Sequence, residues 1–205
     1  MITQEELNMR NYVVVIDRSG SMSDSVSSSN FMSRWNYAKE SVLALARKCT
    51  ELDPDGIDVY TFNRTFQKFS NTTHEKVAEI FKNVSPNGGT DFVPVLTDVI
   101  QNHFEHSDRP TSVIVITDGE PTDGVQGQRN LANLLVNTTK KMESDNEFGI
   151  SFIQIGDDKS ARDFLKKLDD ELVSVGAKFD ICDTKTCDEM ENMSLDQVLL
   201  DIIND

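Results

Sequence analysis

Basic side chains are scarce in this chain of 205 residues, which carries 20 Lys and Arg against 35 Asp and Glu and a net charge of −15. Nucleic-acid backbones and anionic membranes are bound by basic surfaces, so we expect neither as a partner. Residues 143–205 alone carry −11, whereas residues 1–142 carry −4. We expect this acidic C-terminal third to keep the protein soluble or to act as a second docking surface.

Cysteine is also sparse, with Cys49, Cys182 and Cys187 as the full set. An odd, small number predicts reduced thiols, and one Cys-x₄-Cys pair without a second pair argues against zinc. Cys49 lies on an apolar helical stripe, which favours core packing. No apolar run approaches the roughly 20 residues that span a bilayer, and no signal peptide is visible at the N-terminus. These features predict a cytoplasmic protein that is not associated with a membrane.

Several catalytic motifs are missing as well. The chain has no G-x-x-x-x-G-K-[ST] loop and no G-x-G-x-x-G after an expected strand, so the usual nucleotide-phosphate cradles are absent. It also lacks the G-x-S-x-G turn that presents a nucleophilic serine. We therefore expect no catalytic residues and a protein that is not an enzyme.

Short β-branched runs that alternate with helical patterns dominate what is present. Residues 12–16 and 112–117 are almost wholly apolar, as in strands buried on both faces of a parallel sheet. A short strand around Phe66 and Phe69 is expected to pair antiparallel through a turn at Asn63-Arg64. The other strands are expected at residues 57–62, 148–155 and 178–182. This order predicts an α/β fold: a three-layer, doubly wound, Rossmann-like, mostly parallel six-stranded sheet with one short antiparallel edge strand.

Apolar side chains at spacings of three and four predict the helices between these strands. The first stripe consists of Trp35, Ala38, Val42, Leu45, Cys49 and Leu52. The pair Thr72 and Glu75 has the spacing of a capping box that opens the second helix. Further helices are expected at residues 93–106, around Leu131, Leu134, Leu135 and Met142, around residues 161–168, and after Ser194 at residues 195–203. No linker divides the chain, which predicts one domain over residues 1–205 with its core at about 11–204 after a short polar extension at 1–10.

Oxygen-bearing side chains gather where expected strands end. The first strand is followed by Asp17-Arg18-Ser19-Gly20-Ser21, and two later loops read Gly88-Gly89-Thr90-Asp91 and Thr117-Asp118-Gly119-Glu120. Ligands of open α/β sheets bind beyond the carboxyl ends of the strands. Hydroxyl and carboxylate oxygens are hard donors that suit Mg²⁺, Mn²⁺ or Ca²⁺. The candidate ligands are Asp17, Ser19, Ser21, Thr90 and Asp118.

This pattern, D-x-S-x-S … T … D, resembles the metal-ion-dependent adhesion site of von Willebrand factor type A domains. The resemblance extends over nearly the whole chain, from about residue 11 to 204. It implies direct ligation by the hydroxyls of Ser19 and Ser21, and direct or water-mediated ligation by Asp17, Asp118 and Thr90. It also implies a divalent cation, with Mg²⁺ expected ahead of Mn²⁺ or Ca²⁺, and an Asp or Glu carboxylate from a partner protein that completes the coordination. Two carboxylates do not over-neutralise such a cation, so it still attracts another anionic oxygen.

The resemblance thus predicts a metal-dependent protein-binding module, acting as an intracellular adaptor or as a subunit of a larger assembly. The alternative is a Mg²⁺-dependent phosphoryl-transfer enzyme of the haloacid dehalogenase type. Such enzymes resemble D-x-D, and their second aspartate carries the proton during catalysis. Ser19 stands at that position here, which weakens this alternative.

Neighbouring polar residues receive less specific interpretations. Asp91 is expected to cap the following helix or to support the site from outside the metal shell. Arg18 is expected to be solvated, with orientation of a partner carboxylate as the alternative, and neither Glu120 nor Asp123 is expected to be a ligand. A solvated helix face is expected to carry both His103 and His106. The Ser-rich segment at residues 22–33 would form either a flexible loop or a rim of the site that selects the partner.

Overall fold

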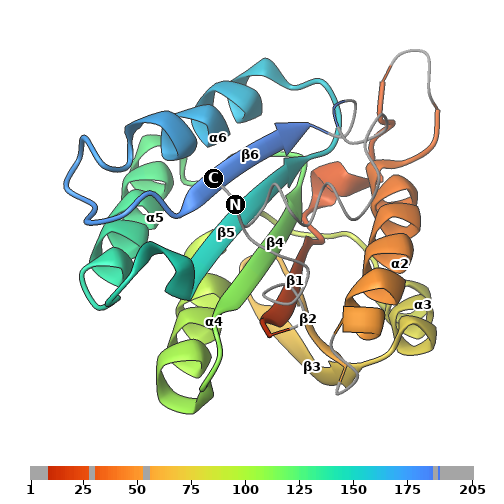
Figure 1. Ribbon diagram of the computed structural model, residues 1–205. Coiled ribbons are helices and arrows are strands. Elements are labelled where there is room, and N and C mark those ends of the chain that lie inside the picture. The colour runs from red at the N-terminus through yellow and green to blue at the C-terminus, as the bar shows by residue number, and fades with distance from the viewer. Residues whose placement is uncertain (1–8, 28–30, 53–55, 187–188, 190–205) are drawn as a thin grey trace.

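The computed structural model describes residues 9–27, 31–52, 56–186 and 189, with the backbone alone described for residues 49–52. Its strands form one six-stranded sheet in the order β3-β2-β1-β4-β5-β6 (Figure 1). All neighbouring strands run parallel except β2 and β3, which pair antiparallel. The strands are β1 (Asn11–Asp17), β2 (Ile57–Phe62), β3 (Phe66–Thr72), β4 (Thr111–Thr117), β5 (Phe148–Gln154) and β6 (Cys182–Thr186). The predicted sheet, with its antiparallel edge strand, is confirmed.

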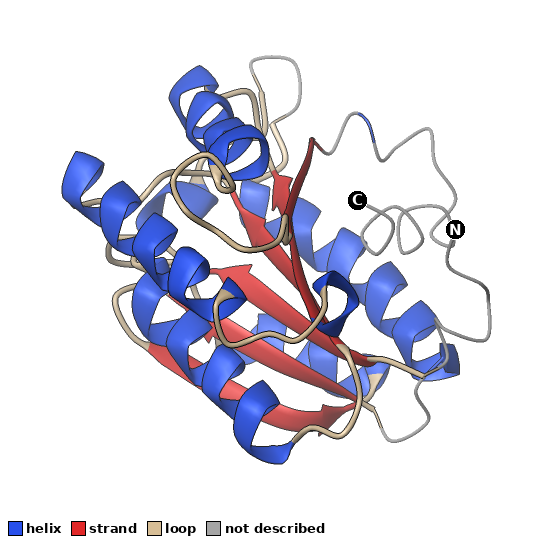
Figure 2. Cartoon of the chain, turned by 60° about the vertical axis from the view of Figure 1, so that its left-hand side comes forward, coloured by secondary structure: helices blue, strands red, loops and turns tan. Residues whose placement is uncertain are grey.

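Helices cover both faces of this sheet, as predicted. The side chains of α2 and α3 pack on one face, and those of α4, α5 and α6 pack on the other. Figures 1 and 2 show the resulting three layers. The helices are α2 (Arg34–Leu52), α3 (His74–Asn83), α4 (Phe92–His106), α5 (Gly124–Thr139) and α6 (Lys159–Glu171), with short 3₁₀ turns η1 (Gly20–Ser23) and η2 (Asp145–Glu147).

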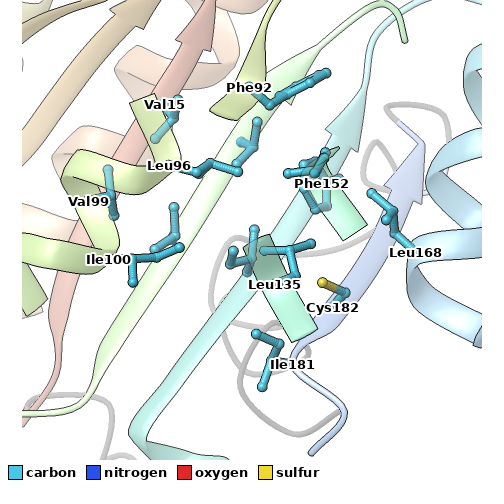
Figure 3. Packing of buried hydrophobic residues seen from close by; sticks show 14 of the residues in the cluster. Val15, Phe92, Leu96, Val99, Ile100, Leu135, Phe152, Leu168, Ile181 and Cys182 are labelled. Carbon is cyan, nitrogen blue, oxygen red and sulfur yellow. The ribbon is translucent and has the colours of Figure 1, made fainter. Parts of the chain in front are cut away.

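The core owes its two halves to the alternation of side chains along the central strands. Along β1, Val15 faces the layer of α4, α5 and α6, whereas Val14 faces α2 and α3, and both are fully buried. Figure 3 shows the first half, in which α4 packs Phe92 and Leu96 against the sheet. The Phe92 ring lies 6.1 Å from the ring of Phe152 on β5. Burying one such large side chain contributes about 1.5–3 kcal/mol, so these contacts fix α4 against the sheet.

The last strand lies later in the chain than predicted. The sequence predicts a last strand at residues 178–182, but β6 begins at Cys182 and continues to Thr186. It lies at the edge of the sheet opposite β3, with β5 as its one neighbour, and its last three residues are only partly buried, so they can be polar. The polar sequence Asp183-Thr184-Lys185-Thr186 therefore hides the strand from a search for apolar runs.

Two helix boundaries also differ from the predictions. Thr72 ends β3 and donates its hydroxyl to the Phe69 carbonyl, so the N-cap of α3 is Thr73 and no Thr72–Glu75 capping box forms. Met142 lies beyond the end of α5 at Thr139, although it is buried. Thr72 is paired with Ile57 in the sheet, which the capping-box spacing does not reveal. The apolar spacing likewise does not reveal where α5 ends. The side chain of Cys49, the residue Cys187 and the expected helix at residues 195–203 lie outside the described part of the chain.

The topology brings the ends of β1 and β4 together. These strands are parallel neighbours, with Ile16 opposite Ile116, so both end at the same edge of the sheet. The strand order also reverses here, because the chain runs outward from β1 to β2 and later returns to β4 on the other side of β1. In Figure 1, η1 lies at this edge, to which the arrowheads of β4 and β5 point. Such a reversal is where open α/β sheets bind ligands.

Candidate functional site

Asp17, the last residue of β1, is fully buried and held through both oxygens of its carboxylate. The Ser19 backbone N–H donates to Oδ1 at 2.7 Å, and the Thr117 hydroxyl donates to Oδ2 at 2.7 Å. Burial, and then the nearby Asp118 carboxylate, raise the pKa of Asp17 from 3.8 to about 7, whereas these two hydrogen bonds lower it. The negative charge of Asp17 is therefore disfavoured in this buried place, and a nearby cation would stabilise it.

The two serines link the end of β1 to Asp118 on the loop after β4. Ser19 Oγ and Ser21 Oγ lie 3.1 Å apart, and the Ser21 hydroxyl donates to Asp118 Oδ1 at 3.1 Å. Ser19 and Asp118 are buried, whereas Ser21 is exposed. Four of the five predicted ligands, namely Asp17, Ser19, Ser21 and Asp118, therefore form one connected cluster with an opening to solvent at Ser21.

Thr90 lies on the loop before α4. The backbone of this loop contacts the turn that carries the two serines. Gly20, between the two serines, donates its N–H to the Gly88 carbonyl at 2.9 Å. Thr90 itself is buried, donates its N–H to the Thr122 hydroxyl at 2.7 Å and accepts the Thr122 N–H at 3.0 Å. Within the described residues no hydrogen bond joins its hydroxyl to the other four, so Thr90 shares the edge of the sheet but is not in the connected cluster.

The side chain of Arg34, which begins α2, reaches into the cluster, and sequence reasoning missed this residue. Its Nη1 donates to Asp118 Oδ2 at 2.6 Å. The guanidinium also lies over Gly156, just after β5, where an added Cβ would come within 2.9 Å of Arg34 Nε. No motif includes Arg34, and 84 positions separate it from Asp118 in the sequence.

Two neighbouring carboxylates have hydrogen-bond partners within the chain, and the predicted capping role of Asp91 is confirmed. Asp91 caps α4 by accepting the Val93 N–H at 3.0 Å. Glu120 accepts hydrogen bonds from Ser160 Oγ, at 2.7 Å, and from Gln128 Nε2. Its carboxylate therefore ties the loop after β4 to α5 and α6 and has no part in the cluster.

The prediction of a solvated face for both histidines is wrong for His103. Its ring is buried, its Nδ1 lies 2.9 Å from the Thr111 hydroxyl, and its Nε2 lies 3.6 Å from the Glu147 carboxylate. Burial lowers the pKa of His103, with a smaller opposing effect from Glu147. His106 is exposed as expected. Cys182 is buried, and burial raises the pKa of its thiol, so it is a core residue.

The described residues contain no group of three or more His, Cys, Asp or Glu side chains that could hold a metal. A cation site here would therefore depend on hydroxyl oxygens together with two carboxylates. Within the same ranges, no helix has the length and hydrophobicity of a membrane-spanning segment.

Comparison with known families identifies the class of protein. The model of the von Willebrand factor type A domain matches residues 12–120, which is more than half of the chain. The chain therefore belongs to the von Willebrand factor type A domain family, whose members are known as protein-interaction modules. Comparison with curated protein sequences gives no match.

Solved structures of this fold are similar to the chain at low sequence identity. A mutant of the PilB minor pilin from Streptococcus sanguinis has a TM-score of 0.67 at 16% identity, over 95% of this chain and 61% of the pilin chain. The SpRpn10 VWA domain has a TM-score of 0.59 at 13% identity over 87% of both chains. The ArnB paralog VWA2 from Sulfolobus acidocaldarius has a TM-score of 0.52 at 17% identity, over 95% of this chain and 44% of that one. At these identities the likeness concerns the fold, and this chain spans less than two thirds of the pilin.

Proposed function

We propose that this chain is a metal-dependent protein-binding module. Its cation would be held by Asp17, Ser19, Ser21, Thr90 and Asp118, the residues that match the metal-ion-dependent adhesion pattern. Mg²⁺ is the expected cation, with Mn²⁺ and Ca²⁺ as alternatives, since all three prefer oxygen ligands. An Asp or Glu side chain of a partner protein would then bind to the cation.

The observation that carries this proposal is the connected cluster of Asp17, Ser19, Ser21 and Asp118. The side chains of Ser19, Ser21 and Asp118 are linked by hydrogen bonds, and the Asp17 carboxylate joins them through the Ser19 backbone N–H. The oxygens that could bind a cation are hydroxyl and carboxylate oxygens. Two of these side chains are acidic, and burial, followed by the nearby Asp118 carboxylate, raises the pKa of Asp17, so its charge is disfavoured in the absence of a cation. The donor set therefore fits a hard divalent cation better than it fits a structural hydrogen-bond network alone.

A bound cation would supply an electrophilic position for an anionic oxygen from outside the chain. Ser21 marks the exposed side of the cluster, so a partner would approach there. With two neutral hydroxyls among its ligands, the cation would keep enough positive charge to attract a further carboxylate. We infer a non-catalytic role, which is supported by the match to a family of interaction modules. We further propose that the protein acts in the cytoplasm, as an adaptor or as a subunit of a larger assembly.

The alternative function, phosphoryl transfer by an enzyme of the haloacid dehalogenase type, finds no support. A mechanism of the haloacid dehalogenase type needs a second carboxylate two positions after Asp17, and Ser19 occupies that position. Glu120, another nearby carboxylate, is bound to α5 and α6 through Gln128 and Ser160. Neither residue offers a free proton carrier at the cluster.

The proposal is tested by capture of partners from native lysate on the immobilised protein, in Mg²⁺ and in EDTA. We expect a protein that is retained in Mg²⁺, released by EDTA and not retained by a Ser19→Ala/Ser21→Ala variant. Ser23→Ala is the matched control, because Ser23 is an exposed serine of the same 3₁₀ turn. Retention that is equal in Mg²⁺ and EDTA, or equal for wild type and the double variant, would contradict the proposal.

A further inference from the structure

The two carboxylates of the cluster are neutralised to different degrees. Asp17 accepts hydrogen bonds from a backbone N–H and a neutral hydroxyl. Asp118 accepts a neutral hydroxyl at Oδ1 from Ser21, but its Oδ2 is paired with the Arg34 guanidinium at 2.6 Å. Among the described residues, Arg34 is the one cationic side chain in hydrogen-bond contact with any of the proposed ligands.

Arg34 is held in this position from several sides. Its side chain is 15% exposed, and that of Asp118 is fully buried, so the ion pair is screened little by water. The Arg34 backbone N–H donates to the Asp24 carbonyl at 2.8 Å, and its guanidinium lies over Gly156, whose φ of +87° suits a residue without a Cβ. A side chain at position 156 would displace the guanidinium. The contact with Asp118 is therefore part of the fold and is not an incidental surface pair.

We propose that Arg34 is a positioning residue that sets the charge of the metal site, an inference that rests on the proposed function. Its guanidinium turns Asp118 so that Oδ1 faces the serine hydroxyls and Oδ2 faces away from them. It also cancels most of the negative charge that Asp118 would bring to a bound cation. The loaded site then retains a net positive charge, because only Asp17 remains as an unpaired carboxylate.

This charge balance affects the two ligands of the site in opposite directions. A fixed guanidinium close to the cation repels it, so Arg34 weakens cation binding. The same positive charge attracts the carboxylate of a partner, so Arg34 strengthens binding to the loaded site. A residue that only kept Asp118 in place would behave differently, because its removal would weaken both steps.

Mn²⁺ binding followed by water-proton relaxation, with acetate as the probe for a partner carboxylate, separates the two steps. For Arg34→Gln we expect Mn²⁺ to bind about tenfold more tightly and acetate to bind the Mn²⁺-loaded protein about tenfold more weakly. Arg34→Lys keeps the charge and should restore both affinities to within about threefold of wild type. Arg109→Gln is the control, since it removes the same charge two residues before β4, at the opposite end of that strand.

The outcomes distinguish this inference from the proposed function. If the wild type binds Mn²⁺ but Arg34→Gln binds it equally or more weakly, the inference is wrong and the metal site stands. An unchanged acetate affinity in Arg34→Gln would equally overturn the inference. If the wild type binds no Mn²⁺, the proposed function fails, and the inference fails with it. Thermal unfolding of each variant in EDTA identifies any variant that does not fold. If Arg34→Gln does not fold, the inference is tested by comparing the Mn²⁺ and acetate affinities of Arg34→Lys, which keeps the positive charge, with those of the wild type.

Discussion

Replacing Asp17 by asparagine should stabilise the protein in EDTA while it removes the response to metal. Asp17 is fully buried, and burial together with Asp118 raises the pKa of its carboxyl from 3.8 to about 7. A change of this size corresponds to about 4 kcal/mol of disfavoured ionisation. The asparagine amide carries no charge, so this penalty disappears near neutral pH in the variant.

Part of the gain is offset by hydrogen bonds. The carboxylate accepts from the Ser19 N–H and the Thr117 hydroxyl, and a net contribution of about 1 kcal/mol for each is typical. The asparagine amide keeps one acceptor, so at least one of these bonds survives. We therefore expect Asp17→Asn to raise the free energy of unfolding in EDTA by about 1–3 kcal/mol, which for a domain of this size raises Tm by several degrees.

Urea unfolding at pH 7.5 in EDTA and again in excess Mg²⁺ measures both effects. The wild type should gain stability in Mg²⁺, and Asp17→Asn should gain none. Asp91→Asn is the matched control, because Asp91 caps α4 and asparagine caps helices equally well, so its stability should change by less than about 0.5 kcal/mol. If Asp17→Asn is less stable than wild type in EDTA, the carboxylate is mainly a structural hydrogen-bond acceptor, and the reasoning is refuted.

Three further predictions concern the rest of the chain. Because burial lowers the pKa of His103, the folded state resists its protonation, and stability should fall as pH drops below about 6.5. The urea midpoint should therefore decrease from pH 7.5 to pH 5.5, and this decrease should be smaller in His103→Gln than in the wild type. The exposed control His106→Gln should behave as the wild type does. Phe31, which is 84% exposed, should tolerate Phe31→Ser within about 0.5 kcal/mol while partner capture decreases; unchanged capture would remove the segment around it from the interface. Phe92→Ala should cost about 3–5 kcal/mol in the same urea assay, and a cost below about 1 kcal/mol would contradict the packing described for α4.

The central sheet could be predicted from the sequence because β1 and β4 are buried on both faces. A run such as Val113–Ile116, all apolar and β-branched, fits few environments other than the middle of a parallel sheet. The edge strand β6 could not be placed in the same way, since pairing with one neighbour leaves its side chains free to be polar. The start of α3 at His74 could not be predicted either, because Thr72 pairs with Ile57 and so belongs to β3. The local sequence carries no information about that pairing.

Part of the candidate site could also be predicted from the sequence, and part could not. The spacing of Asp17, Ser19 and Ser21 predicts a common loop, and the adjacency of β1 and β4 explains why Asp118 joins them. Thr90 lies at the same edge because the loop that carries it is bonded to the serine turn through Gly20 and Gly88. The contact of its hydroxyl with a cation stays a prediction. Arg34 could not have been predicted as part of the site. Its ion pair depends on the direction in which its side chain leaves α2, toward Asp118 after β4 and Gly156 after β5. Helical propensity and apolar spacing carry no information about that direction.

Calorimetric titration of the metal-free protein with Mg²⁺ and Mn²⁺ measures whether the five residues bind a divalent cation. We expect the wild type to bind one equivalent of either cation, Ser19→Ala/Ser21→Ala to bind neither, and Ser23→Ala to bind both as the wild type does. Matched unfolding curves in EDTA for all three proteins would show that the lost binding comes from lost ligands. Absence of binding in the wild type, or equal binding in the double variant, would contradict the assignment of Asp17, Ser19, Ser21, Thr90 and Asp118 as a metal site.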